Sequence, residues 1–151
     1  RSKSELELAT RDIILKLRAT LENILKEMIL GKVRQELSSE AFLKEILQQL
    51  VSIYAQSDLG GDKRLQLNVS KDLQGKLTEW AKNILKETNL NVDINGTLAS
   101  AGFEYQFSGG TVEVTPESAA QALCELISPG MRDLVNQAAG ALAPETNSQK
   151  G

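Results

Sequence analysis

The sequence contains no histidine and a single cysteine among its 151 residues. Histidine is the commonest general base in enzymes and the commonest metal ligand, so its absence excludes a serine triad and any metal centre built on histidine. Cys124 alone can form neither an internal disulfide nor a zinc-thiolate site, and we interpret it as a small buried apolar residue. One cysteine fits a reducing compartment. We therefore expect no metal and no cofactor.

Two further absences limit the possible partners. The chain has 17 lysines and arginines against 20 acidic residues, a net charge of −3, so nucleic acid is not an expected partner. It has no run of about 18 apolar residues, so we expect no direct membrane insertion. Gly60-Gly61 and Gly109-Gly110 match neither GxxxxGK[ST] nor GxGxxG, and we interpret both pairs as turns. No catalytic residue is therefore predicted.

The first feature that the sequence predicts is a long N-terminal helix. From about Ser4 to Leu37 only Gly31 disfavours a helix. At about 1.5 Å per residue the helix is about 50 Å long, more than a small core can cover, so part of it must project. Acid-to-base pairs at i,i+4 spacing support it: Glu7/Arg11, Asp12/Lys16 and Glu22/Lys26.

The apolar residues of this helix recur every eleven residues, in the series Leu6–Leu17–Met28 and Ile13–Ile24. An eleven-residue repeat favours a right-handed supercoil with another helix. Packing of a plain amphipathic helix on its own domain is the alternative. The predicted partner-binding residues are Leu6, Ile13, Leu17, Leu21, Ile24 and Met28.

The middle of the chain alternates helices and strands. We predict a second helix after Ser38 or Ser39, a strand at residues 64–70, a third helix capped by Ser70, and a strand through Val92 that ends in a tight turn at Asn95-Gly96. The faces expected to be buried are Phe42, Ile46, Leu50, Ile53 and Tyr54 on the second helix, and Leu73, Leu77, Trp80 and Ile84 or Leu85 on the third.

Residues 102–127 predict a hairpin followed by a helix. Phe103, Tyr105 and Phe107 alternate with polar residues, residues 108–110 turn the chain, and Val112 and Val114 continue the alternation. Thr115-Pro116 is a typical helix start, and Ser128-Pro129 predicts a further one. The apolar residues of the hairpin, including Val112 and Val114, are expected to be buried against Leu123, Leu126 and Ile127. The last helix should present Met131, Leu134, Val135 and Ala138 or Ala139.

These elements predict an α+β fold: a long N-terminal helix leads into a small, mainly antiparallel sheet of about four strands packed with helices. The expected division is a stalk helix at 1–37, a head domain at 38–143 and a flexible tail at 144–151. Because the chain opens at Arg1 and not at methionine, we expect a fragment or a processed form.

Two segments carry a resemblance to a known family. They are "LENILKEMILGKVRQELSSEAFLKEILQQLVSIYAQ" and "NVDI…AGFEYQFSGGTVEVTPESAAQAL". Over residues 5–142 the order of elements resembles the C-terminal part of the E-type subunit, the peripheral-stalk (stator) component of V/A-type rotary ATPases and ATP synthases. Two features depart from the family: its longer charged N-terminal helix is absent, and Ser108-Gly109-Gly110 replaces its acidic-glycine turn.

The resemblance implies a non-catalytic stator that resists rotor torque in a proton- or sodium-translocating complex. The N-terminal helix would pair with a second stalk subunit of the G or H type. The C-terminal domain would bind the noncatalytic B-type subunit of the ATP-hydrolysing head. The implied location is cytoplasmic and peripheral, on the inner face of a cell membrane. An isolated fragment could pair with a second copy of itself.

Two other functions compete with this hypothesis. The stator of a flagellar or type III secretion ATPase shares the plan of a helix followed by an α/β domain. A small enzyme with a carboxylate base belongs to a different class, and a saturable pocket containing an acid of raised pKa would favour it.

Overall fold

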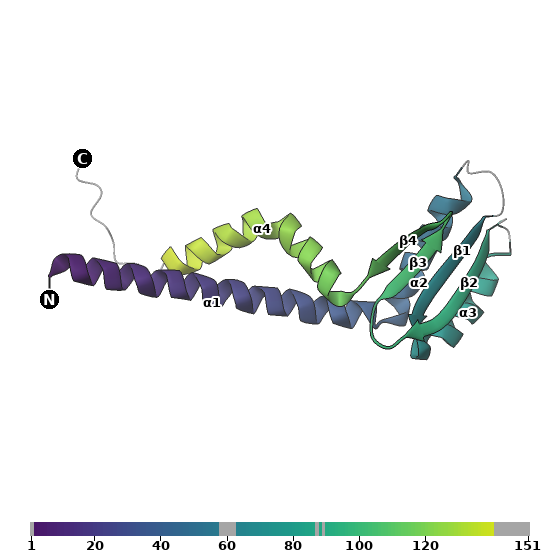
Figure 1. The fold of residues 1–151 in the computed structure, drawn as a ribbon, viewed down its shortest axis with the longest axis horizontal. Helices are drawn as coiled ribbons and strands as arrows, with labels where there is room; N and C mark the ends of the chain where they lie inside the picture. The colour runs from purple at the N-terminus through teal and green to yellow at the C-terminus, as the bar shows by residue number, and fades with distance from the viewer. Residues whose placement is uncertain (1, 58–62, 87, 89, 141–151) are drawn as a thin grey trace. The chain divides into compact units, whose positions relative to one another are not determined.

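The computed structural model describes residues 2–57, 63–86, 88 and 90–140, and within them the chain forms four helices and four strands (Figure 1). This composition confirms the predicted α+β class. The elements are α1 (Lys3–Leu37), α2 (Glu40–Ala55), β1 (Arg64–Ser70), α3 (Lys71–Ile84), β2 (Asn91–Leu98), β3 (Phe103–Phe107), β4 (Gly110–Val114) and α4 (Pro116–Gly140).

The described residues fall into two compact units. The helical unit comprises residues 2–29, which include most of α1, and residues 121–140 of α4, whereas the sheet unit comprises Leu30–Ala120. Both boundaries lie inside a helix, so this division differs from the one expected at residue 37. The predicted tail at 144–151 lies outside the described residues.

The sheet unit has two layers. Its four strands lie in the order β2-β1-β3-β4, with β1 parallel to β2 and the other neighbours antiparallel. Helices α2 and α3 lie on the same face of this sheet (Figure 1). The side chains that β1 directs into the core alternate along the strand, as a half-buried strand requires: Leu65, Leu67 and Val69.

The opposite face of the sheet is polar. Asn68 donates a hydrogen bond from Nδ2 to Glu104 Oε1 at 2.9 Å, and Asn95 Nδ2 donates to Asn68 Oδ1 at 3.2 Å. These bonds satisfy Asn68, which is buried although it is polar. The alternation of apolar and polar residues therefore assigns one face of the sheet to the core and the other to solvent.

The tight turn expected at Asn95-Gly96 is wrong. Strand β2 runs on to Leu98, and Gly96 pairs with Val69 of β1 in the parallel ladder. A Cβ atom on Gly96 would lie 3.1 Å from the Cα atom of Lys71, so glycine here permits the close approach of α3 to the strand. An Asn-Gly pair promotes a hairpin only where the following strand turns back beside its predecessor.

The hairpin of β3 and β4 is confirmed. Ser108 and Gly109 both have positive φ, 52° and 81°, which is the geometry of a two-residue hairpin turn. Phe103 and Phe107 are buried, but Val112 is 42% exposed because β4 is the edge strand. The expectation that Val112 is buried is therefore wrong.

Helix α2 buries a face next to the predicted one. Its N-cap is Ser39, whose hydroxyl accepts a hydrogen bond from the Phe42 amide, as expected. The fully buried residues are Leu43, Leu47 and Val51, whereas Ile53 is exposed. The remaining predicted residues of this face, Phe42, Ile46, Leu50 and Tyr54, are only partly buried and flank the core.

Helix α3 buries Leu73 and Leu77 as predicted, but its third buried position is Ala81 and not Trp80. Trp80 is half-buried and lies under the Lys44 ammonium, whose nitrogen is 5.9 Å from the ring centroid. Helices α2 and α3 therefore contact each other through a cation–π pair as well as through apolar residues.

Helix α4 starts where the sequence predicts. The Ser118 amide donates to Thr115 Oγ1 at 3.0 Å, and Pro116 occupies the first helical position. The further start expected at Ser128-Pro129 is wrong, because Pro129 lies inside one continuous helix. Proline deprives the carbonyl four residues earlier, that of Glu125, of its helical donor. Glu125 is exposed, so water can replace that donor.

The apolar residues that were expected to pack α4 onto the hairpin are exposed instead. Leu123 and Ile127 are exposed, and Leu126 is 78% exposed. The hairpin core is completed by Tyr54 of α2, whose ring centroid lies 4.0 Å from that of Phe107. Tyr54 of α2 therefore covers Phe107 of the hairpin.

Candidate partner-binding surface

The predicted partner-binding residues lie on α1 within the helical unit. Four of the six are between 50% and 65% exposed: Leu6, Ile13, Ile24 and Met28. Leu17 and Leu21 are half-buried. Exposed apolar side chains that follow one face of a helix over more than five turns form a continuous patch, which is typical of an interaction site. We call this set the α1 stripe.

A second face of α1 is covered. Ile14, Arg18, Leu25 and Ile29 are half-buried, together with Leu21. α4 is the only other element described in the helical unit, and its residues line a cavity together with Glu22 and Lys26 of α1, so we infer that α4 covers this face. The first four of these residues are separated by four, seven and four positions. The α1 stripe has the same spacing one residue earlier, at positions 13, 17, 24 and 28.

The face of α4 that meets α1 consists of Cys124, Ser128, Met131 and Val135. Val135 is buried, and the other three are half-buried. Cys124 is therefore less enclosed than its expected role as a buried apolar residue requires. Leu134 and Ala138 were predicted to lie on the apolar face of this helix, but both are exposed. Among the predicted residues whose side chains the structure describes, Val135 alone is buried.

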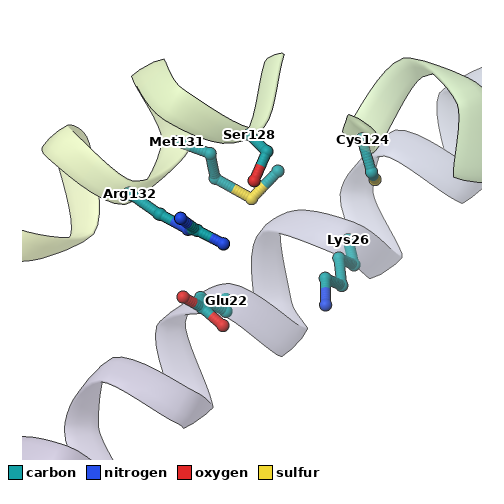
Figure 2. Close-up of a pocket in the computed structure, with 6 residues that line it drawn as sticks. All are labelled: Glu22, Lys26, Cys124, Ser128, Met131 and Arg132. Atoms are coloured by element: carbon teal, nitrogen blue, oxygen red, sulfur yellow. The ribbon is translucent and has the colours of Figure 1, made fainter. Parts of the chain in front are cut away.

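A cavity of about 130 Å³ lies between the two helices of this unit (Figure 2). Glu22 and Lys26 line it from α1, and Arg132 and Ser128 line it from α4, together with Cys124 and Met131. Figure 2 shows the Arg132 side chain directed toward Glu22, with Cys124 farther along α1 beyond Lys26. Residue numbers thus rise in opposite directions, and the two helices are antiparallel.

The charged lining shows that this flank of the helix pair is polar. A cavity of this size can hold several water molecules, and polar groups around it would provide their hydrogen bonds. Of the three predicted i,i+4 pairs, Asp12 and Lys16 form an ion pair of 3.0 Å. Glu22 and Lys26 instead take part in the lining.

We also searched the described residues for metal ligands, glycine-rich loops and membrane-spanning helices. Among the described residues, no three histidine, cysteine, aspartate or glutamate side chains gather where they could hold a metal ion. Gly109 serves the hairpin turn, whereas Gly60-Gly61 lies outside the described residues. No helix in the described part of the chain is long and apolar enough to cross a membrane.

Comparison with known proteins gives no assignment. The chain matches no model of a known protein family, and it matches no curated protein. The candidate site therefore rests on the residues themselves: an exposed apolar stripe of eleven-residue period on α1, and a polar cavity on a different face of the same helix.

Proposed function

We propose that this chain is a non-catalytic stator component, the E-type subunit in the peripheral stalk of a V/A-type rotary ATPase or ATP synthase. The α1 stripe binds the helix of a second stalk subunit of the G or H type. The sheet unit binds the noncatalytic B-type subunit of the head. The pair of stalk subunits resists rotor torque, so that ion movement and ATP chemistry stay coupled at the inner face of the membrane.

One observation carries this proposal: apolar residues of the α1 stripe recur every eleven residues in the series Leu6–Leu17–Met28 and Ile13–Ile24, and four of the six stripe residues are exposed. The neighbouring face, toward α4, has the same spacing and is half-buried. Helix α1 therefore has a second regular apolar face that is largely exposed. A stripe of this period is matched by a helix of the same period, because two supercoiled helices must share one pitch.

Two exposed apolar residues of α1 give a matched test. Ile13 is on the stripe, and Leu15 is also exposed, but two residues turn the helix by about 200° and remove Leu15 from that face. The assay is isothermal titration of the purified chain with the second stalk subunit. Ile13→Lys should weaken binding at least about tenfold, because the lysine charge would be desolvated against apolar side chains.

Leu15→Lys should leave the affinity for the second stalk subunit unchanged within about twofold. Equal loss from both substitutions would show that binding does not use the stripe. Failure of the unmodified chain to bind the second stalk subunit would overturn the proposed function itself.

Hydrogen exchange on the free and the bound chain gives an independent measurement. Amides from Leu6 to Leu17 should exchange fast in the free monomer and slowly once the second stalk subunit is added. Amides from Leu21 to Leu37 should exchange slowly in both. Uniform protection along α1 in a monomer, unaltered by the added partner, would mean that the helix is only part of the core. A concentration-dependent dimer would protect the first segment without the partner.

The chain should also fail to bind nucleotide. No segment of the sequence has the glycine-rich pattern that cradles phosphates. Titration with Mg-ATP should therefore give no heat of binding. A dissociation constant in the micromolar range would contradict the stator assignment.

A further inference from the structure

Helix α4 carries an exposed apolar stripe of its own, which the proposed function does not use. Three of its apolar side chains are between 43% and 55% exposed: Leu123, Ile127 and Leu134. Each directly precedes a residue of the face that meets α1, namely Cys124, Ser128 and Val135. We call Leu123, Ile127 and Leu134 the α4 stripe. Its spacing of four and seven residues is the spacing of the α1 stripe.

On α1, too, stripe residues directly precede residues of the face that meets the other helix. Ile24 precedes Leu25 and Met28 precedes Ile29, so these two stripe residues lie about 100° before residues of the covered face. Two of the residues that follow the covered ones are charged. Glu22 follows Leu21 and Lys26 follows Leu25, and both of these line the polar cavity.

The antiparallel course of the two helices brings the stripes to one side. Two antiparallel helices are related by an approximate two-fold axis that is perpendicular to the plane containing both. A half-turn about this axis exchanges the two helices, but a residue above the plane stays above it. Positions that precede the contact residues on α1 therefore lie on the same side as positions that precede them on α4. The cavity with Glu22, Lys26 and Arg132 marks the other side (Figure 2).

From this juxtaposition we propose that the α1 and α4 stripes form one continuous seat for a third helix, supplied by the second stalk subunit. The proposal rests on the proposed function and adds α4 to the binding site. The three helices then form a bundle in which the partner helix packs between Ile24 and Met28 on one side and Ile127 and Leu134 on the other. The α1 and α4 stripes share the eleven-residue spacing, and a common supercoil would require the same period of the partner helix.

The residues at the outer edges of the seat, which we call its rims, indicate the charge of the partner helix. Five of the nine residues that directly precede stripe positions are charged: Glu5, Asp12, Lys16 and Glu27 on α1, and Asp133 on α4. Lys16 is already paired with Asp12, so the net charge of the rims is negative. The partner helix should therefore carry lysine or arginine beside its apolar residues. Its association with the chain should slow as salt is raised, because screening weakens attraction between exposed charges.

The test compares three single substitutions of exposed residues in the full chain, titrated with the purified second stalk subunit. Ile24→Lys and Leu134→Lys place a charge on the α1 and the α4 stripe. Asn136→Lys is the control: it is exposed on α4 and follows Val135, so it lies on the opposite side of the helix. Circular dichroism should confirm that all three keep the helix content of the unmodified chain.

We expect Ile24→Lys and Leu134→Lys each to weaken binding at least about tenfold, and Asn136→Lys to leave it unchanged. Loss with Ile24→Lys but full affinity with Leu134→Lys would overturn the shared seat and leave the stator function standing. Equal loss with Leu134→Lys and Asn136→Lys would also overturn it, because the effect would not follow the stripe. No binding by the unmodified chain would overturn both proposals.

Discussion

Replacing Phe107 by alanine tests whether Phe107 and Tyr54 close the core of the sheet unit beside the hairpin. Phe107 is only 8% exposed at the end of β3. Its ring centroid lies 4.0 Å from that of Tyr54, and its ladder partner in β1, Leu65, is fully buried. Alanine at this position removes the ring and leaves a cavity between α2 and the sheet.

The expected loss of stability is large. A buried Phe→Ala substitution costs about 3–5 kcal/mol, since the lost burial and the remaining cavity both contribute. A domain is stable by about 5–15 kcal/mol in total, so the substitution removes a substantial fraction of the free energy of unfolding. With a urea dependence of about 2 kcal/mol per molar, the unfolding midpoint should fall by about 2 M.

Fluorescence of Trp80 is a suitable assay. Trp80 is the only tryptophan in the chain and lies on α3, so its emission reports unfolding of the sheet unit. The control is Val112→Ala in the same hairpin, where the side chain is largely accessible and the cost should be about 1 kcal/mol or less. Equal urea midpoints for the two variants would refute the inference that Phe107 and Tyr54 close the core.

Two further predictions concern glycine geometry and pH. Gly102→Ala should destabilise by about 2 kcal/mol or more, because φ is 129° and the new Cβ would lie 2.5 Å from the Val114 carbonyl oxygen. Gly75→Ala, inside α3 with open space around it, should instead stabilise by up to about 1 kcal/mol in the same urea titration. The hydrogen bond from Lys44 holds the pKa of Glu40 below its ordinary value of 4.5, so the ionised carboxylate stabilises the folded chain above that pH. Glu40→Gln should therefore be less stable than the unmodified chain at pH 7, with the difference closing as the pH falls below 4.5; a pH-independent difference would contradict this assignment.

Local features of the sequence predict the elements that depend on neighbouring residues. The single helix at the N-terminus, the caps at Ser39 and Thr115 and the β3–β4 hairpin all follow from periodicity and turn chemistry. Hydrogen bonds within a few residues decide such features, so they can be predicted without knowledge of the fold.

The candidate site is predicted only in part. The eleven-residue period locates the α1 stripe, because one uninterrupted helix shows it repeatedly. The α4 stripe escapes detection for a physical reason: Ser128-Pro129 suggests two short helices, and dividing α4 there separates Leu123 and Ile127 from Leu134. One signal was present in the sequence, the shared spacing of four and seven residues.

Tertiary contacts decided the rest. Parallel pairing with β1 carries β2 through Asn95-Gly96, a pair that would end a strand in a hairpin. Competition for the limited core selects Leu43 and Leu47 on α2 and leaves Ile53 in solvent. The sequence by itself determined where the chain becomes helical or extended and which faces are apolar. Which apolar face is buried and which remains exposed was decided only when distant segments met, because burial of one face depends on what packs against it.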